Sequence, residues 1–202
     1  MERMRSALIL LVAVLAMAIV VLFAASHLHA APRYVVKCSP HLAKASLDTL
    51  ARMMGIREHG GHNRGHEIDI LLGHVGLREP NPWCAATQVT ALDSARGSEP
   101  LPIARTGLAN GIFNDAMKRG RLVAQNVVLP GDLFVYRIPG TSSGHIVRAH
   151  KVLWPWMWTY EGNTSSGSRG SQREGTGSYP RIRRIDEPLG NDRPRGAIGL
   201  GS

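Results

Sequence analysis

Asn81-Pro82-Trp83-Cys84-Ala85-Ala86 is the stretch around which the chain is organised, and it carries one of only two cysteines in 202 residues. Each proline disfavours the α-helical conformation of the residue before it, so a helix can begin only at about Trp83. Apolar residues then recur at helical spacing as far as Ala95, and Gly97 supplies a left-handed stop. Cys84 is therefore predicted to lie in the first turn of a helix, where free N–H groups and the helix dipole favour a thiolate.

This stretch alone leaves two interpretations of Cys84 open. A thiolate at a helix start is a suitable nucleophile, whereas a small hydrophobe buried under the helix is the commoner role of a lone cysteine. The second cysteine, Cys38, could pair with Cys84 in an oxidising compartment. Such a disulfide would block the nucleophile, so it would be a regulatory state.

The composition points to an anionic partner. The formal net charge is +9 and the isoelectric point is near 10.4, which attracts nucleic acid, an anionic bilayer or an anionic cell wall. The sequence has neither a basic helix interleaved with aromatic residues nor zinc-finger spacing, so we predict no nucleic-acid partner. We expect contact with an anionic cell-wall polymer or a membrane surface. The candidate residues for this contact are Arg148, Arg169, Arg173, Arg181, Arg183 and Arg184.

Residues 1–26 are predicted to be a transmembrane signal-anchor or a signal peptide. A short basic segment precedes an unbroken apolar run over residues 7–25, which approaches the span of a bilayer. Small residues at 24–26 offer a cleavage site, so an uncleaved anchor and a cleaved signal both stay open. Residues 27–38 are expected to form a tether. Either interpretation places the rest of the chain outside the cytoplasmic membrane, in the periplasm or the cell wall.

Residues 39–186 are predicted to form one α+β domain, with N-terminal helices packed on a small antiparallel sheet and one hydrophobic helix preceding them. Helices are expected over 39–54, 68–75, 83–95 and 104–119. Strands are expected over 133–138 and 145–152, joined by a hairpin turn, then in a segment that ends at 161–163, and over 181–185. Residues 187–202 are rich in Gly, Pro and Arg and are expected to be a disordered tail.

A base for Cys84 can be sought among the nine histidines. A cysteine nucleophile needs a base within hydrogen-bond reach, and the base needs a third group to orient it. His145 begins a strand directly after a flexible turn, so its ring can stand at the sheet rim over the Cys84 helix. Glu161 and Asn163 are two residues apart on the next strand, and either could accept a hydrogen bond from His145. Alternatively, Asn163 could cap a local turn.

The histidine-rich segment over residues 59–74 has some features of a metal site. His62 and His66 lie four residues apart and could share a helix face. No second pair of ligands follows at a recognisable spacing, so we predict no metal site and no cofactor.

Four motifs occur in an order that resembles the CHAP family. They are Pro82-Trp83-Cys84-Ala85-Ala86, Pro130-Gly131-Asp132, Gly144-His145-Ile146-Val147 and Glu161-Gly162-Asn163-Thr164. CHAP proteins are cysteine- and histidine-dependent amidohydrolases and peptidases, within the papain-like group that includes NlpC-type enzymes. The resemblance covers about residues 42–185. The segment with Glu58, Gly60, Asn63 and Gly65 is also similar to the one upstream of the nucleophile in phage and bacterial cell-wall amidases.

The resemblance implies a papain-like catalytic domain and assigns roles within it. Cys84 would be the nucleophile, His145 the general base and then acid, and Glu161 the group that orients His145, with Asn163 as a fourth polar member. Papain-like enzymes use either type of orienting residue, so this choice stays open. Trp83, Glu58 and Asn63 would contact the substrate. Calcium-binding members carry paired aspartates before the cysteine, whereas this chain has Arg78-Glu79-Pro80-Asn81, so we predict no calcium.

The function implied by this resemblance is hydrolysis of an amide bond in peptidoglycan, as in phage-type lysins. The scissile bond would be the N-acetylmuramoyl-L-alanine amide or a bond within the stem peptide. The protein is expected to act as a monomer. Two alternatives stay open: a catalytically inactive wall-binding or scaffolding module of the same fold, and a papain-like protease or acyltransferase that acts on protein or lipid.

Overall fold

The computed structural model describes residues 12, 14–17, 38–166 and 175–200. The chain divides into two compact units, residues 1–32 and 33–202. Of the first unit, residues 14–17 are helical, and most of the predicted signal-anchor and tether lies outside the described residues. No helix within the described part is long and apolar enough to cross a membrane.

The second unit begins with helices, in agreement with the sequence. They are α2 (Pro40–Arg52), α3 (His66–Gly73), α4 (Cys84–Ala95) and α5 (Ala109–Lys118). The Ser39 hydroxyl caps α2 by accepting from the Leu42 N–H, and Pro40 occupies its first turn. Helix α5 begins five residues later than predicted, since Arg105 donates to the side chain of Asp93 and to a backbone carbonyl and so belongs to a loop.

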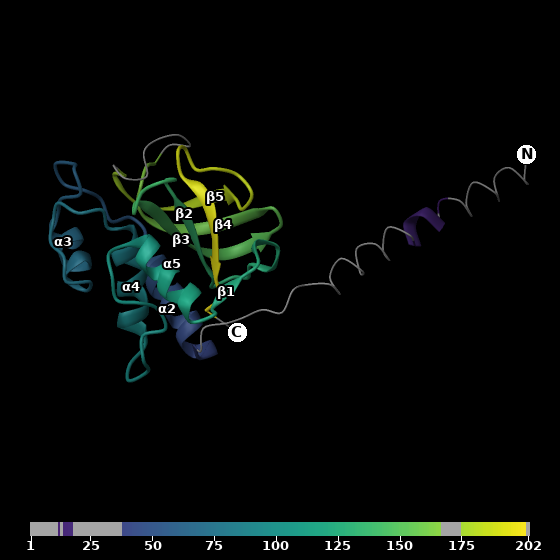
Figure 1. Ribbon diagram of the computed structural model, residues 1–202. Coiled ribbons are helices and arrows are strands. Elements are labelled where there is room, and N and C mark those ends of the chain that lie inside the picture. The colour runs from purple at the N-terminus through teal and green to yellow at the C-terminus, as the bar shows by residue number, and fades with distance from the viewer. Residues whose placement is uncertain (1–11, 13, 18–37, 167–174, 201–202) are drawn as a thin grey trace, which may run out of the picture. The chain divides into compact units, whose positions relative to one another are not determined.

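A six-stranded antiparallel sheet follows the helices, which gather on one side of it (Figure 1). Its strands are β1 (Leu122–Val123), β2 (Leu133–Arg137), β3 (Gly144–Leu153), β4 (Trp156–Thr164), β5 (Gly177–Arg184) and β6 (Arg193–Ile198). The spatial order is β1-β6-β2-β3-β4-β5, with β2 and β3 forming the predicted hairpin. The α+β architecture is therefore the one that the sequence predicts.

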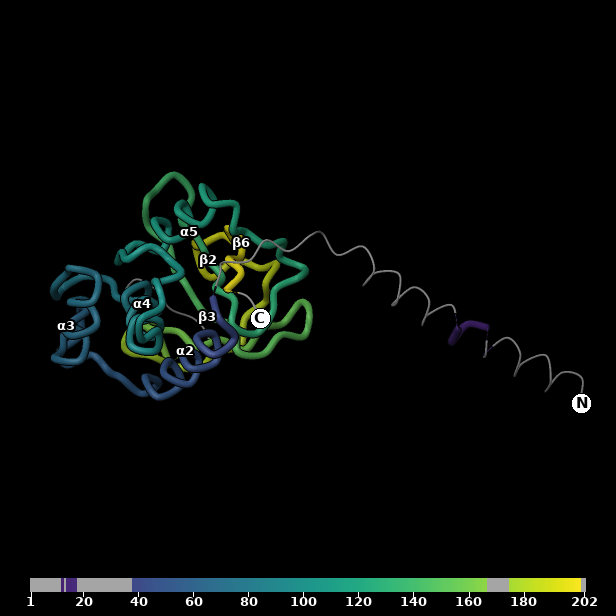
Figure 2. The backbone as a smooth tube through the Cα atoms, turned by 90° about the horizontal axis from the view of Figure 1, so that it is seen from below, coloured from purple at the N-terminus to yellow at the C-terminus, as the bar shows by residue number. Residues whose placement is uncertain are grey.

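The expectation of a disordered tail over residues 187–202 was wrong. Strand β6 lies between β1 and β2, as Figure 2 shows for β6 and β2. Ala197, Ile198 and Leu200 are fully buried, so this segment completes the core and covers an edge of β2 that would otherwise be unpaired. Pro194 lies at a shift in the β2–β6 register, where its missing N–H costs least. The domain therefore extends well beyond residue 186.

The core between α4 and the sheet fixes the position of Cys84. The buried residues of this cluster include Ala85, Val89, Leu92, Ile112, Leu133, Val135, Ile146 and Ile198. Helix α4 packs closely against β4 at Gly162, where an added Cβ would collide with the side chain of Thr87. Only glycine permits this contact, which draws the start of α4 onto the strands that carry the polar residues of the site.

Candidate active site

Cys84 is the first residue of α4 and lies at the rim of the sheet. The residue is 4% exposed, and its sulfur lies 3.9 Å from the carbonyl oxygen of Gly144 at the start of β3. Trp83 precedes it without a side-chain cap, so the first-turn N–H groups of the helix receive no competing side-chain acceptor. The structure thus places Cys84 where the sequence predicts, at a helix N-terminus.

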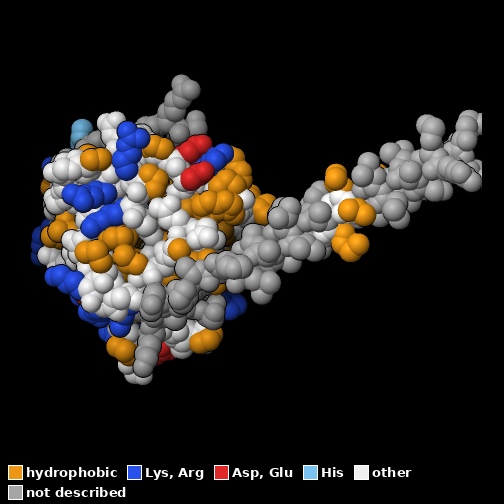
Figure 3. All heavy atoms as spheres, turned by 45° about the vertical axis from the view of Figure 1, so that its right-hand side comes forward, with side chains coloured by type: hydrophobic (Ala, Val, Ile, Leu, Met, Phe, Trp, Pro, Cys, Tyr) orange, Lys and Arg blue, Asp and Glu red, His pale blue; other side chains and the backbone are white. Residues whose placement is uncertain are grey.

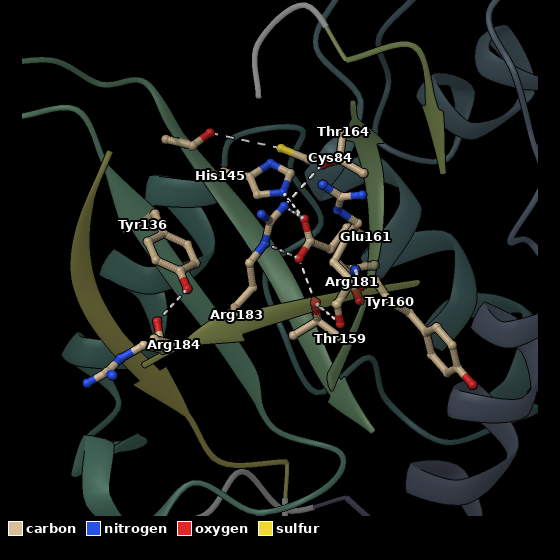
Figure 4. Close-up of polar contacts among 12 residues, drawn as sticks. Cys84, Tyr136, His145, Thr159, Tyr160, Glu161, Thr164, Arg181, Arg183 and Arg184 are labelled. Carbon is tan, nitrogen blue, oxygen red and sulfur yellow. Dashed lines mark hydrogen bonds and ion pairs between the residues drawn. The ribbon is translucent and has the colours of Figure 1, made fainter. Parts of the chain in front are cut away.

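His145 lies between Cys84 and Glu161 (Figure 4). Its Nε2 is 3.1 Å from Glu161 Oε2, and the side chain is 1% exposed. Its Nδ1 has no hydrogen-bond partner among the described residues, and in Figure 4 this edge of the ring faces the sulfur of Cys84. Burial disfavours the charged ring, but Cys84 and Glu161 outweigh it and raise the pKa of His145 from 6.5 to about 9.

Glu161 is fully buried, and hydrogen bonds from three side chains hold its carboxylate. Besides the contact with His145, it accepts from Thr159 Oγ1 at 2.5 Å. Arg183 donates to both carboxylate oxygens, from Nε at 2.8 Å and from Nη2 at 2.6 Å. Burial alone would raise the pKa of Glu161, but His145 and Arg183 hold it well below its usual range. Glu161 is therefore a fixed negative charge behind the imidazole.

Asn163 does not join this group, although the sequence offered it as an equal alternative. The register of β4 against β5 shifts between Glu161 and Thr164, and Asn163 adopts φ of 51°. This irregularity breaks the alternation that would have put Glu161 and Asn163 on one face. The Asn163 side chain is buried without a hydrogen-bond partner among the described residues. Of the two, only Glu161 contacts His145.

Two arginines expected at an anionic surface are buried instead. Arg183 is 7% exposed because it faces inward on β5 to meet Glu161. Arg148 is fully buried, and it donates to the Gly131 carbonyl at 3.1 Å and to the Ser46 hydroxyl at 2.9 Å. Surface contact was thus a wrong expectation for both. Arg181 and Arg184 are partly exposed, whereas Arg169 and Arg173 lie outside the described residues.

The three residues expected to bind substrate form a structural network beside α4. Trp83 is fully buried in a cluster with Ile68 and Leu72, so its ring does not reach the surface. Its indole N–H donates to Glu58 at 3.1 Å, and the other oxygen of Glu58 accepts from the Asn63 backbone N–H at 3.1 Å. These contacts fasten the loop before α3 onto the start of α4. In this structure, substrate contact by Trp83 is therefore not supported.

A cleft opens beside Cys84 and has a mostly apolar wall. Its lining residues are Leu77, Asn81, Pro82, Cys84, Gly107, Leu108, Ala109, Ile138, Ser142, Ser143, Gly144 and Asp192. Asp192 is the one acidic side chain in this lining, and no basic side chain belongs to it. Sequence reasoning missed Asp192 because it lies in the segment taken for a tail. It also missed the role of Arg183, because a cluster of arginines gives no local sign of which one faces inward.

The other described histidines and Cys38 do not extend the site. Within the described ranges, no group of three or more His, Cys, Asp or Glu side chains is arranged to hold a metal ion. His74 instead contacts Asp93, with Nδ1 3.1 Å from a carboxylate oxygen. Cys38 and Cys84 are both free thiols in this structure.

Comparison with known proteins yields distant structural similarity only. No family model matches the sequence, and no curated protein matches it either. One similar structure is a mutant of the resuscitation promoting factor interacting protein RipA, with 11% identity and a TM-score of 0.45 over 85% of this chain and 70% of that one. Another is a lipoprotein-like NLP/P60 family protein from Staphylococcus aureus subsp. aureus Mu50, with 12% identity and a TM-score of 0.43 over 85% of this chain and 45% of that one. Similarity at this level concerns the mixed helix and sheet fold and assigns no activity.

Proposed function

We propose that this protein is a peptidoglycan hydrolase that cleaves an amide bond with Cys84 as nucleophile. The observation that carries the proposal is the arrangement of a helix-start thiol, an imidazole whose unpaired edge faces it, and a buried carboxylate on the other side of the imidazole. His145 Nε2 is 3.1 Å from Glu161, while the opposite edge of the ring faces Cys84 (Figure 4). A nucleophile, a base and an orienting group in this order are the parts that acyl transfer requires.

In the proposed reaction, each group has one task. The Cys84 thiolate attacks the carbonyl carbon, and the backbone N–H of Cys84 helps to hold the oxyanion. The C–N bond then breaks as the protonated His145 gives its proton to the departing amine. Water, deprotonated by His145, attacks the thioester and releases the acid and the thiolate. Glu161 stabilises the imidazolium throughout, as its low pKa allows it to stay ionised.

The substrate class rests on two resemblances: that of four sequence motifs to the CHAP family, and that of the segment around Glu58 and Asn63 to cell-wall amidases. Both the amidase and the endopeptidase alternatives stay open, and so does membership of the CHAP family. A leader at residues 1–26 would bring the domain to the cell wall. Lys and Arg side chains are spread over the face seen in Figure 3 with few acidic side chains among them, which suits an anionic polymer or membrane surface.

Digestion of purified muropeptides tests the proposal directly. New amino termini identified by mass spectrometry would distinguish a muramoyl-alanine cut from a stem-peptide cut. We expect Cys84→Ala to abolish cleavage with little change in melting temperature, while the matched variant Cys38→Ala keeps activity. Cleavage that persists in Cys84→Ala would overturn the proposed nucleophile.

A catalytically inactive wall-binding module of the same fold is the alternative, and the low exposure of the Cys84 thiol favours it. Alkylation by iodoacetamide at pH 6 separates the two. Burial raises the pKa of Cys38, so this thiol should stay unlabelled. Rapid labelling of Cys84 that is lost in His145→Ala supports an enzyme, and an inert Cys84 supports the binding module.

A further inference from the structure

Asp192 lies at the same end of the sheet as Cys84 and His145. A tight turn presents it, closed by two backbone hydrogen bonds between Leu189 and Asp192 at 2.8 and 3.0 Å. Strand β6 starts at the next residue, where Arg193 pairs with Arg137 of β2. Arg137 in turn pairs with Gly144, the neighbour of His145 on β3. This register explains why Asp192 reaches the wall of the cleft that contains Cys84.

One oxygen of the Asp192 carboxylate lacks a hydrogen-bond partner among the described residues, although the residue is almost completely buried. The residue is 7% exposed, and its Oδ1 has no hydrogen-bond partner among the described residues. Asp132, another buried aspartate, instead accepts from the Leu129 and Leu200 N–H groups at 2.9 and 3.1 Å. Burial raises the pKa of Asp192, and the nearby His145 only partly offsets this. The fold therefore retains a buried carboxylate oxygen without a hydrogen bond, which costs free energy.

The surroundings of Asp192 indicate the charge of the missing partner. Apart from Asp192 and the proposed Cys84 thiolate, the cleft lining is apolar or neutral, in a chain whose net charge is +9. The nearby Arg195 is occupied, because it donates to the side chain of Asn114 at 2.6 Å and to Asn110. A cation that enters this cleft would therefore find an acceptor that no described side chain of the protein already uses.

We propose that Asp192 forms a subsite for a primary ammonium group of the substrate, next to the scissile amide. The ammonium would be the free α-amino terminus of a peptide or the side-chain amine of a diamino acid. Such a group carries one positive charge and three N–H donors, which suits a carboxylate with an unused buried oxygen. This inference rests on the proposed function, because it assigns the substrate preference of the same cleft.

Acetylation of the amine provides the sharpest test. Muropeptides would be prepared in three forms: unmodified, acetylated on the α-amine, and acetylated on the side-chain amine. For the wild-type protein we expect kcat/KM to fall at least about tenfold for one acetylated form, and this form identifies the source of the ammonium. Equal kcat/KM for all three forms would overturn the proposal. This measurement uses only the wild-type protein, so it does not depend on the folding of a variant.

The variant Asp192→Asn links the preference to this residue. We expect the ratio of kcat/KM between free and acetylated substrates to approach one, with activity on the acetylated form retained. The matched control is Asp186→Asn, which removes an exposed carboxylate outside the cleft lining and should keep the preference. A preference that survives in Asp192→Asn, or an equal loss on all substrates, would show that Asp192 does not bind the amine.

Binding measurements keep this inference separate from the proposed hydrolysis. Calorimetric titration of the Cys84→Ala protein with the same muropeptides measures affinity without turnover. Amine-dependent affinity that disappears in Cys84→Ala/Asp192→Asn would support the subsite even if the wild-type protein cleaves nothing. Affinity that ignores the amine would contradict the subsite even if hydrolysis is confirmed.

Discussion

Two buried carboxylates lie near His145, and their contacts differ sharply. Glu161 accepts hydrogen bonds from His145, Thr159 and Arg183. Burial alone would raise its pKa, but His145 and Arg183 lower it. Asp192 is largely but less completely buried, its Oδ1 has no partner within the described residues, and burial raises its pKa. The protein thus holds one carboxylate in a fixed geometry and leaves the other unsatisfied. The first arrangement suits an orienting group, and the second suits a ligand contact.

The largest effect is expected when the satisfied carboxylate loses its charge. In Glu161→Gln the shape is kept, but the imidazolium of His145 loses the negative charge behind it. We expect kcat/KM to fall about 100- to 10,000-fold, as when the carboxylate of a catalytic triad is neutralised. Steady-state kinetics on muropeptides would measure this. A loss below tenfold would place Glu161 outside the reaction and remove its contrast with Asp192.

The next effect concerns the cation that holds Glu161. In Arg183→Met the Glu161 carboxylate loses two hydrogen bonds and its buried countercharge. Breaking a buried ion pair from one side typically costs about 3–5 kcal/mol in the free energy of unfolding. Urea denaturation would measure this loss. The neighbouring variant Arg184→Met, which removes an exposed ion pair with Asp186, should have a much smaller effect.

A double variant sharpens this result. Glu161→Gln/Arg183→Met removes both charges together, so neither is left buried alone. We expect part of the stability lost in Arg183→Met to return, although catalysis stays low. If the two single losses simply add, the pair is not coupled as the contacts at 2.6 and 2.8 Å suggest.

The pH dependence of activity reports on the same pair. The pKa of His145 is raised to about 9, so the imidazolium needed to protonate the leaving amine persists at neutral pH and is lost as pH rises through 9. We therefore expect kcat/KM to decline with an alkaline limb near pH 9. Glu161 is one of the groups that raise this pKa, so in Glu161→Gln the limb should move toward 6.5, the ordinary imidazole value. An unmoved limb would mean that another group titrates there.

Local chain chemistry was sufficient to predict much of the site. The two prolines before Trp83 fix the start of α4, and the turn before Gly144 fixes the β2–β3 hairpin, so the positions of Cys84 at a helix start and His145 at a strand start could be predicted from sequence. Local sequence could not show whether Glu161 or Asn163 contacts His145. This contact depends on a register irregularity beside Gly162, whose close contact with Thr87 joins segments far apart in the chain.

The partners of the two carboxylates could not be predicted for related reasons. A cluster of arginines on β5 is typical of a solvated surface, and only the register of β4 against β5 shows that Arg183 faces inward. The segment around Asp192 has a disorder-like composition, and its stability comes from Ala197, Ile198 and Leu200 packing into a core built by other strands. Tertiary contacts override local composition in both cases.

The smallest expected effect tests whether the buried Asp192 carboxylate destabilises the fold. The pKa of Asp192 is higher in the folded chain than in the unfolded chain. At pH values above both pKa values, the ionised carboxylate therefore lowers the free energy of unfolding. This loss of stability disappears as the pH falls through the two pKa values. Asp192→Asn should therefore raise the melting temperature at pH 7 by a few degrees, the size that about 1 kcal/mol produces in a domain of this length. Thermal denaturation at pH 7 and pH 4 would show the difference shrinking at the lower pH. The exposed variant Asp186→Asn should show little change at pH 7. A melting temperature lowered by Asp192→Asn would mean that this carboxylate supports the fold, as Glu161 does.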